Sequence, residues 1–361
     1  MPISPSFKRK QPCPILAVTM GDPGWIGPEI ITKAFRDYKL SPGCFYLLIG
    51  VPAVFEFLGD RLGFQLPLNP IPTLEPSFLR DDSVNFLDIS EEASWLLKKV
   101  ESVKNMNPEN LEGEYVFDIG KISLVNASMA YASMKVAAYQ AATGLVDAVV
   151  TAPVNKTAIR LIDPKFQGHT EYLAKVSRSK SYAMMFVSNR LKVTLATIHV
   201  PLKKVSRMIT KQLVLEKIRL TDQFLKTYFK IPKPKLAVCA LNPHGKETGD
   251  EEETHILPAC ETAQADNIDA HGPLSADQLF HDAYEGRFDA VISMYHDQGL
   301  APFKMIAFRD GVNVTLGLPF IRTSPDHGTA FDIAYQGKAD PVSMKSALTL
   351  AEKLLEGKAR P

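Results

Sequence analysis

The sequence lacks the features that mark several large classes of protein. Its 361 residues carry 41 basic and 40 acidic side chains, so the formal charge is +1 and no broad electrostatic field favours nucleic acid or a membrane surface. No apolar stretch approaches the length of a membrane span. The run Ile15–Met20 is too short for the apolar region of a signal peptide. We therefore expect a cytoplasmic protein that binds neither nucleic acid nor membrane.

Two kinds of short motif are also missing. The four cysteines form no CxxC pair and fall mostly within apolar runs, where Cys behaves as a small hydrophobic residue, so we expect reduced structural thiols. The glycine-rich GxGxxG signature of an ordinary dinucleotide site does not follow the first expected strand. Gly21–Glu29 instead predicts a turn that leads into a helix from about Pro28. A dinucleotide would have to be bound by other loops.

Short runs rich in Val, Ile and Leu alternate with helical patterns. This alternation predicts an α/β fold with crossover units and a largely parallel sheet covered by helices on both faces. With 45% apolar residues, a chain of this length can bury a core and form two lobes. The expected strands are Ile15–Thr19, Phe45–Ile49, Val84–Asp88, Ala148–Ala152, Val193–Thr197, Leu236–Leu241 and Ala290–Met294.

Three further segments have distinct patterns. Asn126–Thr143 is rich in alanine and ends before Gly144, which predicts a helix that packs closely against its neighbours. Val214–Tyr228 carries apolar residues at helical spacing and predicts an amphipathic surface helix. Lys98–Lys121 is polar, and we expect an extended surface loop there.

Three histidines come directly after expected strands: His199, His244 and His296. Open α/β sheets bind ligands at the carboxyl ends of their strands, and three imidazoles on one such edge would make an open metal site. A histidine in a loop after a strand is also commonly a surface or hydrogen-bonding residue. The sequence spacing leaves both interpretations open.

Two groups of polar residues are candidates for binding an anion. Gly168–Glu171 precedes an apolar helical run, so free backbone N–H groups, Thr170 and His169 could converge on a phosphate. An ordinary helix cap is the alternative. Lys304, Asn313 and Arg322 interrupt apolar sequence that should lie near the core, so each needs a partner. A substrate phosphate or carboxylate would serve, and so would a buried salt bridge.

Six motifs are spread over nearly the whole chain after about Pro14. They are Thr151–Lys156, Gly168–Glu171, Leu241–His244, Gly272–Asp277, Met294–Gly299 and, the longest, Gly311–Gly328. Together they resemble the 4-hydroxythreonine-4-phosphate dehydrogenase family, which shares the isocitrate and isopropylmalate dehydrogenase fold. The resemblance implies a two-lobed architecture with the active site in the cleft between the lobes. We expect residues 1–155 and 297–361 in one lobe, and residues 156–296, with the dimer contacts, in the other.

The resemblance also implies a set of site residues. A divalent ion (Zn, Mg or Co) would be held by His199, His244 and His296, the last from the partner in a homodimer. The substrate would contact His169, Thr170, Lys304, Asn313 and Arg322. His327–Ala334 is similar to the HGSAPDIA stretch that wraps the adenosine of the cofactor in isopropylmalate dehydrogenases. NAD or NADP is therefore expected at His327, Gly328, Thr329, Ala330 and Asp332.

Two departures from the family pattern stand out. Gly24-Trp25 replaces the usual Ala-Gly, which puts an indole where the backbone should approach something closely. Gly245–Gly249 is shorter than the usual Gly-rich loop and introduces Lys246 beside an expected metal ligand. A cation there could alter substrate preference, but neither change removes a proposed ligand.

The implied activity is NAD(P)-dependent oxidation of 4-hydroxythreonine-4-phosphate to a 3-keto acid, which loses CO2 to give 3-amino-2-oxopropyl phosphate in pyridoxal 5'-phosphate biosynthesis. Asp297 and Lys156 are candidates for the general base. A sister dehydrogenase of 4-phosphoerythronate or 4-phosphothreonate would use the same metal and phosphate chemistry. A phosphate acyltransferase and a non-catalytic phosphometabolite-binding protein are further alternatives.

Overall fold

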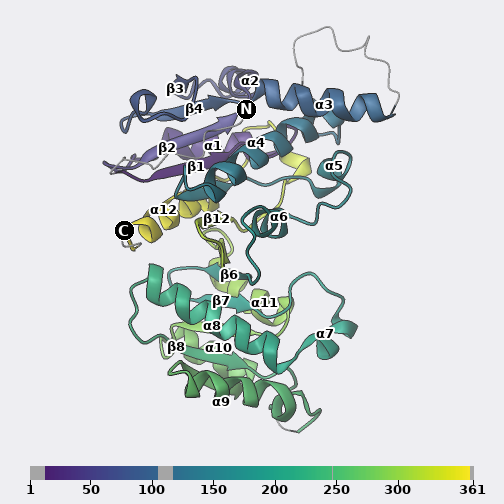
Figure 1. The fold of residues 1–361 in the computed structure, drawn as a ribbon, viewed down its shortest axis with the longest axis vertical. Coiled ribbons are helices and arrows are strands. Elements are labelled where there is room, and N and C mark those ends of the chain that lie inside the picture. The colour runs from purple at the N-terminus through teal and green to yellow at the C-terminus, as the bar shows by residue number, and fades with distance from the viewer. Residues whose placement is uncertain (1–12, 105–116, 246, 358–361) are drawn as a thin grey trace. The chain divides into compact units, whose positions relative to one another are not determined.

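The computed structural model describes residues 13–104, 117–245 and 247–357 (Figure 1). The chain divides into two compact units. The first is Met1–Tyr172 with His327–Lys345, and the second is Leu173–Asp326 with Ser346–Pro361. These divisions fall later in the chain than those expected after residues 155 and 296, and Ser346–Pro361, expected in the first lobe, belongs to the second unit. The first division lies later because the helices that begin at Lys156 and His169 start within the first unit.

The first unit contains five strands in the order β3-β4-β2-β1-β5, and every neighbouring pair is parallel. Every residue of β1 and of β5 is buried, as expected for strands that are covered on both faces. The strands are β1 (Ile15–Thr19), β2 (Phe45–Gly50), β3 (Leu68–Ile71), β4 (Val84–Asp88) and β5 (Ala148–Thr151).

Crossover helices connect the parallel strands of this unit, as parallel pairing requires. They are α1 (Gly27–Arg36), α2 (Pro52–Leu62), α3 (Ser90–Lys104) and α4 (Leu124–Ala142). Two further helices follow β5: α5 (Lys156–Arg160) and α6 (His169–Val176), which reaches the division between the units. The alanine-rich α4 packs against α3, and the Ser123 hydroxyl accepts the Asn126 N–H to cap it. The prediction of a loop at Lys98–Lys121 is wrong for the first part of this range, because α3 continues to Lys104. Residues 105–116 lie outside the described part of the chain.

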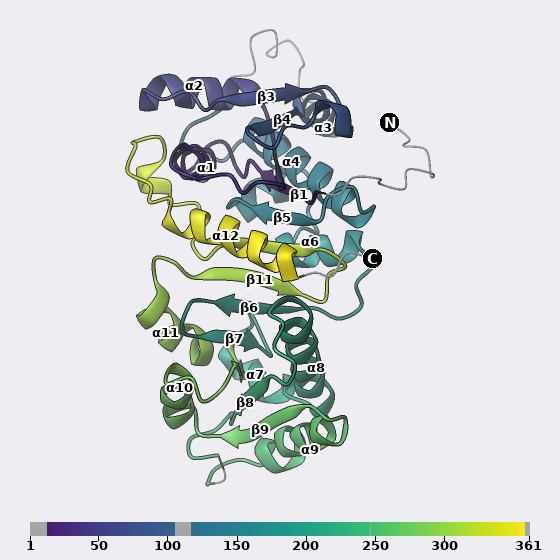
Figure 2. The ribbon, with the colours of Figure 1, turned by 90° about the vertical axis from the view of Figure 1, so that its left-hand side faces the viewer.

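The second unit contains seven strands in the order β12-β11-β6-β7-β10-β8-β9. Figure 2 labels β6, β7, β8 and β9 in this order, with β10 between β7 and β8 in the sheet. The pairs among β7, β10, β8 and β9 are parallel, whereas β7–β6, β6–β11 and β11–β12 are antiparallel. The strands are β6 (Ala183–Val187), β7 (Lys192–Leu195), β8 (Lys235–Cys239), β9 (Asp269–Leu274), β10 (Ala290–Ser293), β11 (Val312–Leu316) and β12 (Ile321–Pro325).

Helices cover this second sheet and close its core. They are α7 (Leu202–Met208), α8 (Lys211–Tyr228), α9 (Leu257–Ala265), α10 (Ala276–Tyr284), α11 (His296–Ala307) and the last part of α12 (Val342–Gly357). Val193, Val291 and Ala237 from three strands pack with Phe280 of α10 and Phe303 of α11 in one buried cluster. The amphipathic helix expected at Val214–Tyr228 is confirmed as part of α8.

All seven expected strands are present, with ends that shift by two residues at most, and the α/β fold class is confirmed. Five strands were not expected: β3, β6, β9, β11 and β12. Ser188 shows why the second sheet is mixed: its hydroxyl accepts the Leu191 N–H in a tight turn that only an antiparallel pair can use. In the described part of the chain, no helix is long and apolar enough to cross a membrane.

Candidate active site

The three strand-end histidines follow three neighbouring strands of the second unit. β7, β10 and β8 lie side by side in this order and run parallel, so their carboxyl ends meet at one edge. His199 lies four residues beyond β7, His244 lies five residues beyond β8, and His296 is the first residue of α11 after β10. The expectation that these imidazoles follow adjacent buried strands is therefore met.

His199 and His296 of the same chain come close to each other. Their ring centroids are 5.6 Å apart, with 41° between the ring planes. Two imidazoles that bind one ion through nitrogens at about 2.0–2.1 Å have ring centres roughly 5–6 Å apart, so this pair fits a divalent ion. Asp297 Oδ1 lies 2.7 Å from His296 Nδ1, an arrangement that fixes the ring and directs Nε2 outward.

His244 stands apart from this pair. Its backbone is left-handed, with φ of 57°, its side chain is exposed, and Nδ1 lies 2.9 Å from Glu247 Oε2. The Glu247 carboxylate raises the pKa of His244 above its usual value. Among the described residues, no three His, Cys, Asp or Glu side chains are grouped closely enough to hold a metal ion. Lys246, beside this loop, lies outside the described residues.

Two of the expected phosphate-binding residues share one face of the β11–β12 ribbon. Asn313 pairs with Ser324 across the ribbon, and the same register places Thr315 opposite Arg322. Arg322 is buried, and its Nη1 donates to the Thr315 hydroxyl at 3.2 Å. The buried Asn313 Oδ1 has no hydrogen-bond partner among the described residues. A buried acceptor in this state is costly unless a ligand or water donates to it.

Lys304, on α11, has a partner within its own unit. Its ammonium group donates to the Asp326 backbone oxygen at 3.0 Å and lies 3.4 Å from the Asp326 carboxylate. The competing interpretation, an internal ion pair, thus applies to Lys304 in this structure. Because its side chain is only half-buried, the ammonium can still turn toward an anion.

In the first unit, Lys156 and the start of α6 lie together. Lys156 opens α5, where the Asn155 side chain accepts the Ala158 N–H as the cap. A Cβ placed on Gly168 would lie 3.5 Å from Lys156 Nζ, so this ammonium reaches the glycine that precedes His169. His169 and Thr170 are the first two residues of α6, where backbone N–H groups and the helix dipole favour an anion.

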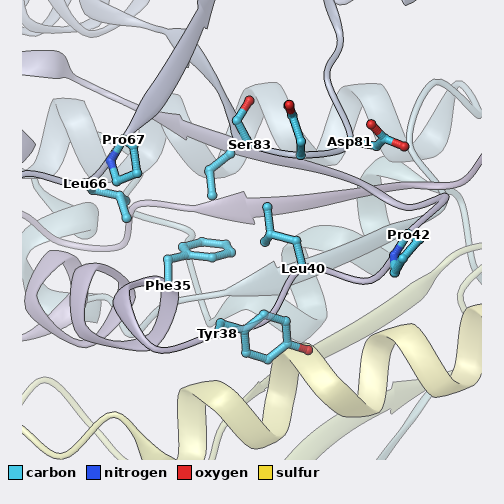
Figure 3. Close-up of a pocket in the computed structure, with 10 residues that line it drawn as sticks. Phe35, Tyr38, Leu40, Pro42, Leu66, Pro67, Asp81 and Ser83 are labelled. Atoms are coloured by element: carbon cyan, nitrogen blue, oxygen red, sulfur yellow. The ribbon is translucent and has the colours of Figure 1, made fainter.

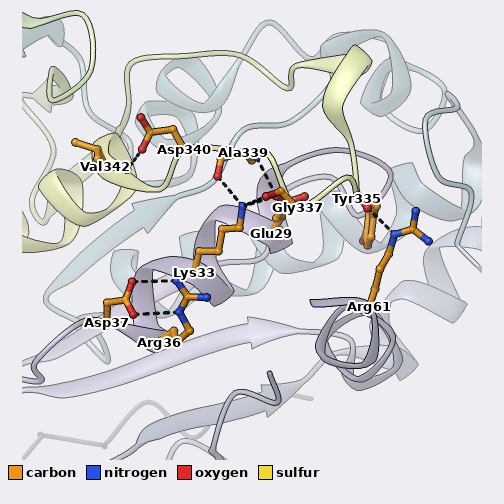
Figure 4. A network of polar contacts seen from close by, with 10 residues as sticks. All are labelled: Glu29, Lys33, Arg36, Asp37, Arg61, Tyr335, Gly337, Ala339, Asp340 and Val342. Carbon is orange, nitrogen blue, oxygen red and sulfur yellow. Dashed lines mark hydrogen bonds and ion pairs between the residues drawn. The ribbon is translucent and has the colours of Figure 1, made fainter. Parts of the chain in front are cut away.

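The expected cofactor segment, His327–Ala334, belongs to the same unit, and the residues that directly follow it are held by α1 and α2 (Figure 4). Lys33 donates to the backbone oxygens of Gly337 at 2.8 Å and Ala339 at 2.9 Å. Glu29 accepts both Lys33, at 2.8 Å, and the Ala339 N–H, at 2.9 Å. Arg61 donates to the Tyr335 backbone oxygen. Residues 335–339, which follow the cofactor segment, are thereby fixed.

Trp25 contacts the middle of the cofactor segment. Its ring meets that of Phe331 edge to face, with the centroids 4.5 Å apart. Trp25 is 3% exposed and Phe331 is 59% exposed, so a buried indole supports an exposed phenyl ring. Gly24 has no room for a methyl group beside the Asn126 side chain and the Asp118 oxygen, which accounts for the loss of the usual alanine. The indole takes up a packing role that the sequence did not indicate.

Asp22 is a further buried group that sequence reasoning missed. Burial raises its pKa from 3.8 to about 6, although backbone N–H groups of Gly24 and Asn155 act in the opposite direction. Its backbone N–H donates to the Pro153 oxygen at 3.1 Å, so it ties the end of β1 to the loop that carries Lys156. The sequence signal that could have identified Asp22 is a carboxylate three residues after a buried strand.

The chain was then compared with known proteins. Residues 72–351 match the family model described as "Pyridoxal phosphate biosynthetic protein PdxA". The chain belongs to the PdxA family. The resemblance read from the sequence motifs is thereby confirmed.

Relatives in this family are similar over nearly their whole length. A 4-hydroxythreonine-4-phosphate dehydrogenase of Desulforapulum autotrophicum is 41% identical over 94% of this chain and 94% of its own. A D-threonate 4-phosphate dehydrogenase of Pectobacterium atrosepticum is 40% identical over 94% and 99%. A solved 4-hydroxythreonine-4-phosphate dehydrogenase from Klebsiella pneumoniae has a TM-score of 0.79 at 33% identity, over 94% and 99% of the two chains. These PdxA relatives are dehydrogenases by name.

Proposed function

We propose that this chain is a dehydrogenase that oxidises 4-hydroxythreonine-4-phosphate with a nicotinamide cofactor, in pyridoxal 5'-phosphate biosynthesis. The observation that carries the proposal is membership of the PdxA family at 41% identity over 94% of a dehydrogenase relative. The histidines that follow β7, β10 and β8 support it, because they place metal-binding groups at the edge where open α/β sheets bind ligands.

The substrate phosphate is bound by charged and polar side chains and by a helix start. His169 and Thr170 supply the helix start, and Arg322, Lys304 and Asn313 supply side-chain donors. Arg322 is buried and bonded to the Thr315 hydroxyl, so its guanidinium group is held in a set direction. Lys304 would release the Asp326 oxygen in favour of the phosphate.

His199, His244 and His296 would hold a divalent ion (Zn, Mg or Co), which when bound would supply Lewis acidity at the substrate hydroxyl. Two protein groups are candidates to accept the hydroxyl proton. Asp297 is 86% exposed and bonded to His296, so it would act through or beside that ring. Lys156 reaches the start of α6 in the first unit and would have to be neutral to act as a base.

The nicotinamide cofactor, NAD or NADP, would accept the hydride and bind along His327, Gly328, Thr329, Ala330 and Asp332. Gly328 has open space where a side chain would stand, and Ala330 adopts φ of 46°, so the backbone curves with little obstruction. The exposed Phe331 ring offers a flat apolar surface for the adenine. Release of CO2 from the 3-keto acid follows this oxidation.

The active unit is a homodimer with a shared site. Large apolar side chains on the last turns of α11 are exposed, Met305 at 89% and, just after the helix, Phe308 at 75%. Apolar groups in such numbers on a surface mark an interface. Because α11 begins at His296, a second copy that covered this helix would also approach the strand-end histidines. The histidine set that is incomplete in one chain would be completed there.

A second candidate substrate is D-threonate 4-phosphate. The Pectobacterium relative of that name is 40% identical, almost the same as the first relative. The two substrates differ at one carbon, which carries a hydroxyl in one and an amino group in the other. A residue that binds the amino group would therefore determine which of the two substrates is preferred.

The test is a panel of substrates whose turnover is monitored through nicotinamide absorbance at 340 nm. We expect reduction of the cofactor with 4-hydroxythreonine-4-phosphate, and loss of this signal when a chelator removes the ion. Faster turnover of D-threonate 4-phosphate would assign the second function. No turnover of either compound, with each metal and both cofactors supplied, would reject the dehydrogenase proposal.

A further inference from the structure

A cavity of about 550 Å³ lies in the first unit, away from every residue proposed for the dehydrogenase (Figure 3). Three segments line it, residues 35–42 from the end of α1 onward, 66–67 before β3, and 81–84 at the start of β4. It therefore lies at the amino ends of these parallel strands. Lys156, by contrast, follows the carboxyl end of β5, at the opposite edge of the same sheet.

The walls of the cavity are mostly apolar and are held in place. Phe35, Tyr38 and Tyr46 meet edge to face, with centroid separations of 6.1–6.4 Å. The Ser41 N–H donates to the Tyr46 hydroxyl at 2.9 Å and fixes the segment between these rings. Leu40 faces Phe35 and Tyr38 in the cavity (Figure 3). A preformed space of this size with aromatic walls is typical of a small-molecule site.

The polar groups of the lining include two carboxylates and no positively charged group among the described residues. Asp81 and Asp82 are exposed carboxylates that make no hydrogen bond or ion pair within the described chain. The buried Ser83 hydroxyl likewise has no partner among the described residues. Among the residues that the structure describes, no basic side chain lines the cavity. The lining thus combines two negative charges and a buried hydroxyl with aromatic rings. These groups have no positively charged donor as a partner.

We propose that this cavity binds a small molecule that carries an ammonium group on a flat aromatic body. The ring of the ligand packs against Phe35 and Tyr38, and its ammonium group donates to Asp81, Asp82 or both. The aromatic faces also attract a nearby cation, which adds to the charge preference. The site is independent of the dehydrogenase proposal, because it shares no residue with it.

The probe is 2-phenylethylamine, titrated by calorimetry into the whole chain in buffer without metal or nicotinamide cofactor. We expect a Kd of about 1 mM, typical of a ligand this small. Two relatives of the probe separate its parts. 3-Phenylpropionate keeps the ring but reverses the charge and should not bind, and butylamine keeps the ammonium group but lacks the ring and should bind more weakly.

A pair of double variants assigns the charge to this cavity. Asp81→Asn with Asp82→Asn should weaken 2-phenylethylamine binding about tenfold, as expected for the loss of a charge-assisted bond. Glu91→Gln with Glu92→Gln is the matched control, because it also removes two adjacent exposed carboxylates, but from the first turn of α3 beyond the carboxyl end of β4. The control should bind like the original protein. All four residues are exposed, so the fold should tolerate these changes.

Hydrogen exchange locates the ligand. Bound 2-phenylethylamine should slow exchange in residues 35–42 and 81–84 and leave α3 unchanged. Three results would each overturn the proposal: no heat of binding at 10-fold the expected Kd, equal affinity for 3-phenylpropionate, or unchanged affinity in the Asp81→Asn, Asp82→Asn variant. A failed titration here says nothing about turnover, and failed turnover says nothing about this cavity.

Discussion

The cofactor segment of the first unit and the histidine edge of the second unit are built in different ways. Tyr335–Ala339, which directly follows the cofactor segment His327–Ala334, is fixed by the chain itself, through Glu29, Lys33 and Arg61. His244, in contrast, is exposed on left-handed backbone and bonded to a local carboxylate. A surface for an organic cofactor can be preorganised by buried polar contacts. In the proposed function, the histidine edge would be completed by components outside the chain, an ion and a second copy.

The largest expected effect is at the histidine edge. Replacement of His199, His244 or His296 by Ala should abolish turnover, because each removes a ligand, and should leave the fold intact since His199 and His244 are exposed and His296 is half-buried. Turnover with and without added metal, and circular dichroism for the fold, check this. Full activity of the His244→Ala protein in metal-free buffer would contradict the assignment.

Pairwise mixing of these inactive variants shows how subunits share the site. If two histidines come from one chain and one from its partner, exactly two of the three mixtures restore about a quarter of the activity by random pairing. The mixture that fails identifies the two histidines of one chain. The family resemblance predicts failure of the His199/His244 pair, whereas the 5.6 Å ring contact favours failure of His199/His296. Failure of all three, with subunit exchange verified, would reject the shared site.

The next effect concerns the support beneath the cofactor segment. Lys33→Met leaves the fully buried Glu29 without its cation, so we expect a loss of stability of about 3–5 kcal/mol and a higher KM for the cofactor. Glu29→Gln with Lys33→Met removes both charges and should recover part of the stability. Urea unfolding and cofactor titration measure the two effects. A double variant less stable than the single one would contradict the ion-pair explanation.

Asp22 predicts how stability changes with pH. Its pKa is raised to about 6, so between pH 4 and 6 the folded state keeps a proton that the unfolded chain has lost. The free energy of unfolding should therefore fall as pH rises through this range, by up to about 3 kcal/mol, and level off above it. Asp22→Asn should remove this fall. Unfolding followed by the fluorescence of the buried Trp25 tests it, and parallel pH curves for both proteins would contradict it.

A smaller effect is expected at the phosphate. Lys304→Met should raise the KM for the phosphorylated substrate about tenfold, through one lost charge-assisted bond. Equal catalytic efficiency for 4-hydroxythreonine and its phosphate would rule out the proposed phosphate contacts.

The smallest effect should come from Phe331. Phe331→Ala removes the exposed ring that Trp25 supports, and we expect a few-fold rise in cofactor KM with little loss of stability. Phe331→Tyr keeps the ring and should behave like the original protein. An unchanged KM in the alanine variant would remove Phe331 from the cofactor site.

The regular parts of the fold could be predicted, and the reason is burial. Strands such as β1 and β5 are covered on both faces and read as continuous apolar runs. β11 and β12 were missed because Asn313 and Arg322 interrupt their apolar pattern. The polarity that marked these two residues as binding candidates also hid the strands that carry them.

For the site, the sequence indicated residues but not contacts. The strand-end rule placed His199 and His296 correctly at neighbouring strands, because adjacent parallel strands share an edge. No local pattern could indicate that Lys304 would bond to Asp326, or that Trp25 would meet Phe331. These partners are brought together only by tertiary packing.

The distance along the chain between Glu29 and Ala339 has a consequence for protein synthesis. The hydrogen bond between them spans 310 residues, although both belong to the first unit. At about 5–20 residues per second, a ribosome delivers Ala339 roughly 15–60 seconds after Glu29. Until then the buried carboxylate of Glu29 and the ammonium of Lys33 lack their backbone partners. The first unit to begin synthesis therefore stays incomplete until residues 173–326 of the second unit have been made, and chaperones would meet it with this surface open.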